Sequence, residues 1–90
     1  MHKITLLEPT PNLNGTSRSD LLEQYRAVAH AAHDLRKAMM ACVPHGRDYP
    51  RSPVDAGIAR EAHFEFYRII ADMEDQYTNI AIDLMKGTNQ

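Results

Sequence analysis

Apolar residues recur at helical spacing along two long stretches of the chain. Between residues 18 and 43, and again between residues 54 and 86, they are separated alternately by three and four positions. This spacing puts apolar side chains on one face of an α-helix, because 3.6 residues make one turn. A polar stretch, PHGRDYPRSP at 44–53, lies between the two. The pattern predicts an all-α protein, an antiparallel two-helix hairpin that turns at 44–53.

One apolar stripe on each predicted helix has the spacing of a coiled-coil seam. The first stripe comprises Tyr25, Val28, Ala32, Leu35, Met39 and Cys42, and the second comprises Ala59, Ala62, Phe66, Ile70, Met73, Tyr77, Ile80 and Leu84. We expect the stripes to pack together, with small alanines of the second opposite Met39 and Leu35. Cys42 is then a buried reduced thiol, and as the single cysteine it forms no disulfide within the chain.

Residues near the predicted helix ends match the usual capping preferences. Asp20 followed by Glu23 resembles a capping box, and Ser17 and Ser19 are alternative N-caps. Gly87 suits a glycine cap at the end of the second helix.

The first seventeen residues form an N-terminal arm ahead of a hairpin domain that we place at 18–90. KITLL at 3–7 suits an extended strand, and Pro9 and Pro11 interrupt it. The arm is either disordered or docks on a helix. Ninety residues with a net charge of −2 make one small domain without the positive field that favours nucleic acid. No apolar run is long enough for a membrane span or a secretory signal, so we expect a cytoplasmic protein.

Each predicted helix has a second apolar strip that one hairpin seam leaves unburied. The strip comprises Leu22, Ala29, Met40 and Val43 on the first helix, and Phe64, Tyr67, Ala71, Ile82 and Met85 on the second. Exposed apolar patches of this kind usually mark an interface. We expect two hairpins to form a four-helix bundle through these residues, a homodimer being favoured. The alternatives are that the arm covers the strip, or that a host protein does.

Five histidines in ninety residues raise the question of a metal site. The expected register brings His33 roughly level with His63, which makes a histidine–carboxylate site conceivable. The chain has no HExxH motif and no pair of Glu-x-x-His motifs. We therefore interpret the histidines as surface residues rather than metal ligands, and we expect the protein to have no cofactor.

Basic residues gather at the turn and at the start of the second helix. Arg47, Tyr49, Arg51 and Arg60 lie where free N–H groups of that helix also point, a combination that suits a phosphate or a nucleotide. The simpler interpretation is that Arg47 and Asp48 only stabilise the turn. We expect that the protein is not an enzyme, because the chain has no nucleophile elbow, phosphate-cradling glycine loop or recognisable catalytic triad.

The predicted turn and second helix contain a distinctive set of residues, Arg47, Asp48, Tyr49 and Pro50, followed by Glu61 and His63. With these residues, the segment at 45–82 resembles small, largely uncharacterised helical-hairpin proteins of tailed bacteriophages and prophages. That resemblance implies a phage accessory protein in the cytoplasm of a bacterial host. Because small helical phage proteins often inhibit or sequester host or defence factors, we expect action by protein–protein interaction. The alternative is an oligomer that binds a phosphorylated small molecule or nucleotide signal at the turn.

Overall fold

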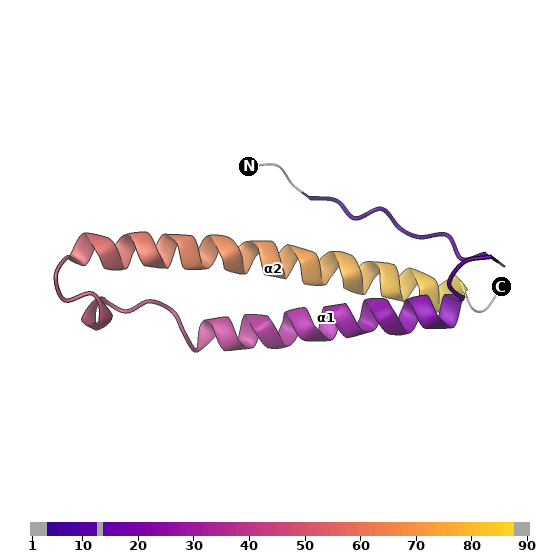
Figure 1. Cartoon of the computed structure of the whole chain (residues 1–90), viewed down its shortest axis with the longest axis horizontal. Coiled ribbons are helices and arrows are strands. Elements are labelled where there is room, and N and C mark those ends of the chain that lie inside the picture. Colours follow the sequence, from indigo (N-terminus) through magenta and orange to yellow (C-terminus); the bar gives the residue numbers. More distant parts are fainter. Residues whose placement is uncertain (1–3, 13, 88–90) are drawn as a thin grey trace.

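Two long helices packed against each other make up most of the protein. The computed structural model describes residues 4–12 and 14–87. Helix α1 spans Arg18–Met40, a short 3-10 helix η1 spans Gly46–Asp48, and helix α2 spans Pro53–Gly87. The helices run antiparallel along a rod of 60 × 25 × 19 Å (Figure 1). The described residues contain no strand, so the all-α hairpin prediction is confirmed. The expected arm and hairpin domain also include residues 1–3, 13 and 88–90, which lie outside the described residues.

Helix α1 begins at a serine cap and ends earlier than the pattern predicts. The Asp20 backbone N–H donates a hydrogen bond to Ser17 Oγ at 3.2 Å, so Ser17 is the N-cap and Asp20 is inside the first turn. At the other end, the N–H of Ala41 caps the helix on the carbonyls of Ala38 and Met39. The prediction of a helix to residue 43 is therefore three residues too long. Cys42 lies beyond the helix and is exposed, so the expected buried thiol is wrong.

Helix α2 matches its predicted bounds of 54–86 within one residue at each end. Pro53 suits the first turn because its missing N–H has no helical partner there. Gly87 does not form the expected left-handed cap, since none of the described glycines has a positive φ angle. It instead makes room for a neighbour: a Cβ at this position would lie 2.0 Å from Nη1 of Arg18.

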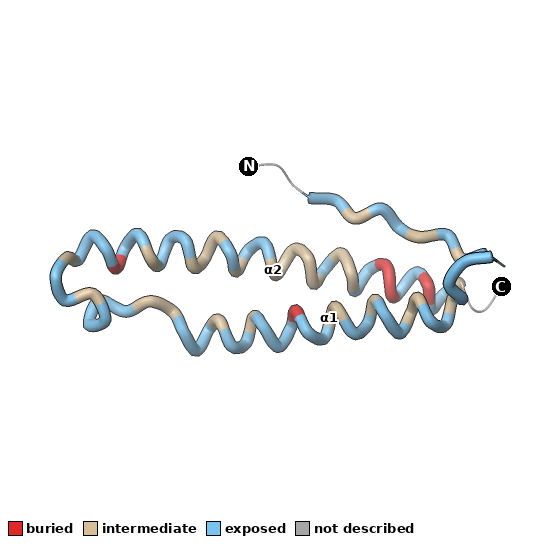
Figure 2. The backbone as a smooth tube through the Cα atoms, in the orientation of Figure 1, coloured by how far each residue is buried: buried red, intermediate tan, exposed pale blue. Residues whose placement is uncertain are grey.

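The core between the helices is thin. Among the residues that the structure describes, five apolar ones are buried, and three of them are alanines: Ala32, Ala56, Ile80, Ala81 and Leu84 (Figure 2). Two large side chains of the predicted seam, Leu35 and Phe66, are exposed instead, Phe66 to 63%. Their neighbours Arg36 and Tyr67 meet between the helices. The contact faces there are thus one residue, or about 100°, away from the predicted stripes.

The register of the two helices also differs from the expected one. The ring centroids of Tyr25 and Tyr77 lie 5.3 Å apart, and Arg36 reaches both Tyr67 and Glu74. The prediction set Leu35 opposite Ala62. That residue lies more than one helical turn along α2 from Tyr67 and Glu74, the residues that contact Arg36. The linker at 41–52 extends along the first turns of α2 beyond the end of α1, which accounts for the shift (Figure 1).

The segment before α1 lies beside the C-terminal half of α2. The Gln76 side chain hydrogen-bonds to the backbones of Ile4 and Leu6. Figure 1 shows this segment on the side of α2 that faces away from α1. In the part of the chain that the structure describes, neither helix has the length and apolar content needed to cross a membrane.

Candidate functional site

A polar cluster connects the two helices near the middle of the hairpin. Arg36 of α1 extends to α2, where its Nε lies 2.5 Å from Oε1 of Glu74 and its Nη1 donates to the Tyr67 hydroxyl at 3.1 Å. The guanidinium carbon is 5.8 Å from the centroid of the Tyr67 ring. All three side chains are half-buried. One α1 side chain therefore makes two polar bonds to α2, seven residues apart, and fixes the helix register.

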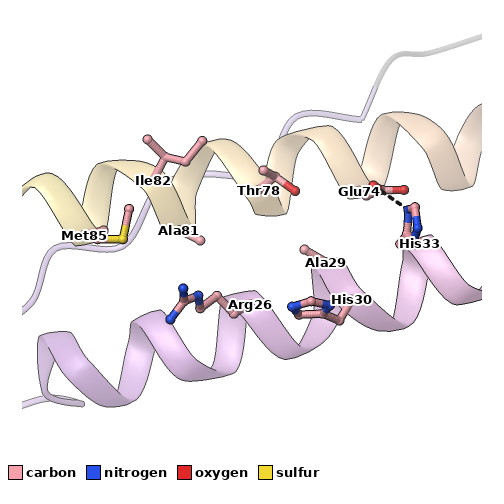
Figure 3. A pocket seen from close by; sticks show the side chains of 9 residues that line it. All are labelled: Arg26, Ala29, His30, His33, Glu74, Thr78, Ala81, Ile82 and Met85. Atoms are coloured by element: carbon pink, nitrogen blue, oxygen red, sulfur yellow. Dashed lines mark ion pairs between the residues drawn. The ribbon is translucent and has the colours of Figure 1, made fainter.

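His33 lies at the edge of this cluster. Its Nδ1 is 3.5 Å from Oε2 of Glu74 (Figure 3). The same atom is 3.4 Å from Nη2 of Arg36. The ring is largely exposed, whereas the Glu74 carboxylate is half-buried. With a proton on Nδ1, His33 donates to Glu74, and in the tautomer without that proton Nδ1 accepts from Arg36.

The electrostatics of the cluster favour a permanent ion pair. The hydrogen bond from Arg36 holds the pKa of the Glu74 carboxyl below its usual value, against a smaller opposing effect of desolvation. The same bond, together with the one to Tyr67, raises the pKa of Arg36. A carboxylate with a lowered pKa is a weak general base at neutral pH. The arrangement is therefore suited to holding the helices in place, or to contacting a partner, rather than to proton transfer.

A groove runs from this cluster toward the C-terminal end of α2. Its nine lining residues all come from the two helices and enclose about 420 Å³: Arg26, Ala29, His30, His33, Glu74, Thr78, Ala81, Ile82 and Met85 (Figure 3). Ala29 and Ala81 have small side chains, which leaves the space open between the helices. The α1 wall is basic and the α2 wall is largely apolar beyond Glu74, so the groove offers both apolar and polar contacts to a partner.

The structure brings part of the predicted interface strip to this groove. Ala29, Ile82 and Met85 line it together, and Ile82 and Met85 are exposed. Tyr67 is instead bonded to Arg36, and Met40 is exposed at the end of α1, away from the groove. The remaining predicted interface residues are half-buried: Leu22, Val43, Phe64 and Ala71. None of the described residues before α1, 4–12 and 14–17, lines the groove, so they do not cover that part of the strip.

The two candidate metal ligands are not brought together. His33 is beside Glu74, which is eleven residues, or about 16 Å of helix, from His63. His63 packs edge-on against Phe64 with ring centroids 5.4 Å apart, and its buried Nε2 has no hydrogen-bond partner among the described residues. Residues 4–12 and 14–87 contain no group of three or more His, Cys, Asp or Glu that is arranged to hold a metal ion. The expected pairing of His33 with His63 is wrong because the helix register differs.

The candidate anion-binding residues lie around the linker, where some already have partners. Arg60 Nη2 donates to the Pro44 carbonyl at 3.3 Å, which ties the linker to α2. The backbone N–H of Arg47 donates to Nδ1 of His45 at 3.2 Å and helps to form η1. The side chains of Arg47 and Arg51 are exposed, and Tyr49 is half-buried. This part of the predicted site thus has a structural role in the turn.

Compared with known protein families, curated proteins and solved structures, the chain matches none of them. The function has to be inferred from the geometry alone.

Proposed function

We propose that this chain is a non-enzymatic interaction protein. Two copies pack through their groove faces as a four-helix bundle, and the assembled surface blocks a bacterial host or defence factor in the host cytoplasm. The groove supports this proposal, because its apolar wall holds the exposed Ile82 beside small Ala29 and Ala81. An apolar face of this kind gains free energy when a partner removes it from water.

The thin core of the single hairpin also supports self-association. No side chain of the described residues is completely buried, and large apolar side chains remain exposed on both helices. Small domains with limited cores are commonly stabilised by disulfides, metals or oligomerisation. With a single cysteine in the chain, no internal disulfide is available, so a second copy is the simplest source of further apolar contact.

Two isoleucines of α2 provide a matched test of the groove. Ile82, in the groove, and Ile69, outside it, are exposed to similar extents, 38% and 40%, and lie about 140° apart around the helix. We expect Ile82→Asp to convert a dimer to a monomer in light scattering and to remove the rise of the melting temperature with concentration. Ile69→Asp should leave both unchanged.

A monomeric wild-type chain, or dissociation by Ile69→Asp alone, would contradict the proposed groove interface. The same pair of variants tests the host-directed activity. Expression of the wild type and of Ile69→Asp in bacteria should slow growth, and expression of Ile82→Asp should not. Equal growth with all three proteins would contradict inhibition through this face.

Binding of a phosphorylated ligand at the linker is the alternative. The exposed side chains of Arg47 and Arg51 near the start of α2 favour it, whereas Arg60 is already bonded to the Pro44 carbonyl. A nucleotide that raises the melting temperature of the wild type, but not of an Arg47→Ala, Arg51→Ala variant, would support this alternative. The absence of any shift at high ligand concentration would exclude it.

A further inference from the structure

A single side chain on the outer side of α2 holds the leading segment. Gln76 is two residues after Glu74, so it lies about 160° around the helix from the side chain that contacts α1. Its Oε1 accepts a hydrogen bond from the Leu6 N–H at 2.7 Å, and its Nε2 donates to the Ile4 carbonyl. In an extended chain, the carbonyl of one residue and the N–H of the second residue after it lie on the same edge. Gln76 therefore pairs with that edge as a neighbouring strand would.

Asp72 fixes the orientation of this carboxamide. Its Oδ2 accepts the second hydrogen of Gln76 Nε2 at 2.9 Å from one turn earlier on α2. Because an ionised carboxylate only accepts hydrogen bonds, the NH₂ group must face Asp72, which leaves Oε1 to accept from a peptide N–H. Both donors of Gln76 and its acceptor are thus in use. The Gln76 carboxamide is therefore set up to recognise the backbone of the bound segment.

An apolar surface lies next to Gln76. Leu6 is half-buried, whereas Ile4 and Leu7 on either side of it are exposed. Ile80, one turn after Gln76, is only 6% exposed although it lies about 120° around α2 from Glu74. The leading segment runs along α2 on the side that faces away from α1 (Figure 1), and Leu6 is the leucine of this segment that is shielded from solvent. The segment therefore contributes an apolar anchor as well as two backbone bonds.

We propose that the surface of α2 around Gln76 is a binding site for an extended peptide segment. Gln76 recognises the backbone, and the surface beside it takes one leucine-sized side chain. In the structure, residues 4–8 of the same chain occupy the site. When that segment is released, the same segment of a second copy is the ligand that fits. This site lies outside the groove and does not depend on the function proposed above.

Reversible occupancy follows from the small number of contacts and from an opposing charge. Two hydrogen bonds to one side chain and one half-buried leucine hold the segment. Glu8, two residues further on, shares a hydrogen bond with the carboxyl of Asp83 on α2 while one of the two is protonated, and this bond raises the pKa of Glu8. Once both carboxyls are ionised they repel each other, which favours release. Segments held this weakly open locally without unfolding of the domain.

The test uses the full chain and a labelled peptide with the sequence of residues 4–12, ITLLEPTPN. In a Leu6→Asp chain, the chain's own segment loses its apolar anchor and leaves the site open. We expect this chain to bind the peptide about tenfold more tightly than the wild type, whose own segment competes. Adding Gln76→Leu to the Leu6→Asp chain should abolish peptide binding. Adding Gln24→Leu instead, a matched change at an exposed position of α1, should leave peptide binding intact.

Equal peptide affinity of the wild-type and Leu6→Asp chains would overturn the proposal, as would binding that survives Gln76→Leu. Hydrogen exchange gives an independent measurement on otherwise unmodified chains. Exchange of the Leu6 amide should accelerate with Gln76→Leu and not with Gln24→Leu, and equal rates would overturn the proposal. To test exchange between copies, two full chains that both carry Ile82→Asp are mixed, one with the wild-type leading segment and one with Leu6→Asp. Light scattering then shows whether one copy supplies its leading segment to the other. A two-chain complex supports binding of the segment of a second copy, and single chains that still bind the peptide overturn that part of the proposal.

Discussion

At the scale of residues, one arginine takes a place between the helices that the apolar pattern assigns to the leucine beside it. Arg36 lies next to Leu35, which the apolar pattern places in the seam, yet Arg36 is the residue between the helices. Its long stem covers apolar surface while its guanidinium reaches Glu74 and Tyr67. Because both partners lie on the same side of α2, the pair of bonds determines which face of each helix points inward.

This cluster predicts a non-additive effect of substitution. Glu74→Leu alone leaves Arg36 partly buried without its counterion, so we expect a fall of several degrees in the melting temperature. Arg36→Leu alone should do the same. The double variant should lose less than the sum of the two, because no unpaired charge remains. Asp75→Leu, at an exposed neighbouring position, is the control. Additive losses would show that Arg36 and Glu74 are not coupled.

The pKa shifts of Glu74 and Glu8 predict opposite responses to acid, one for the stability of the hairpin and one for docking of the leading segment. The pKa of Glu74 is lowered by Arg36, so its contribution to hairpin stability is complete above its ordinary value of 4.5 and is lost as the pH falls through the lowered pKa. The pKa of Glu8 is raised by Asp83, so docking of the leading segment is favoured below 4.5 and weakens as the pH rises through the raised pKa.

Circular dichroism and amide exchange measure these two responses separately. On acidification from about pH 6 to about pH 3, within the range where carboxyls titrate, thermal stability of the helices should fall while the Leu6 amide becomes better protected. Glu74→Gln should reduce the first effect and Glu8→Gln the second. Parallel changes of both signals, insensitive to these variants, would contradict the assignment.

At the scale of elements, the start of α1 was the helix boundary that the sequence left open. Residues 17–20 contain three plausible caps, and the structure selects Ser17, whose Oγ accepts from the Asp20 N–H. The choice depends on the backbone of the residue that precedes the helix, which is extended at Ser17, with φ −62° and ψ 156°. A list of side chains that are able to cap does not contain that information.

The cap predicts a specific loss of stability. Ser17→Ala should lower the free energy of unfolding by about 1 kcal/mol, because the Asp20 N–H loses its acceptor. Ser19→Ala, inside the helix, should cost clearly less, as should Asp20→Ala. Chemical unfolding monitored by circular dichroism measures all three. A larger loss with Asp20→Ala than with Ser17→Ala would mean that Asp20 is the effective cap.

At the scale of the whole molecule, the rod has apolar surface on two sides. One side holds the groove with Ile82 and Met85, and another holds Leu35, Phe66 and Ile69. The leading segment binds at Gln76 and does not line the groove. A single layer of two helices has no interior large enough for all these side chains, because each helix presents only one face to the other. The dimer proposed above belongs to this scale, and the Ile82→Asp and Ile69→Asp pair tests it.

The sequence by itself determined the two helices, their antiparallel order and an excess of apolar residues over what one seam holds. These properties depend on spacing along the chain, which a linear pattern records. Only the tertiary structure decided the register, the inward position of Arg36, the exposure of Phe66 and the docking of residues 4–8 on Gln76. Each of these depends on a bond between residues that are distant in the sequence. Such bonds require that α2 takes one particular position along α1, beyond the linker at 41–52, and no local pattern specifies that position.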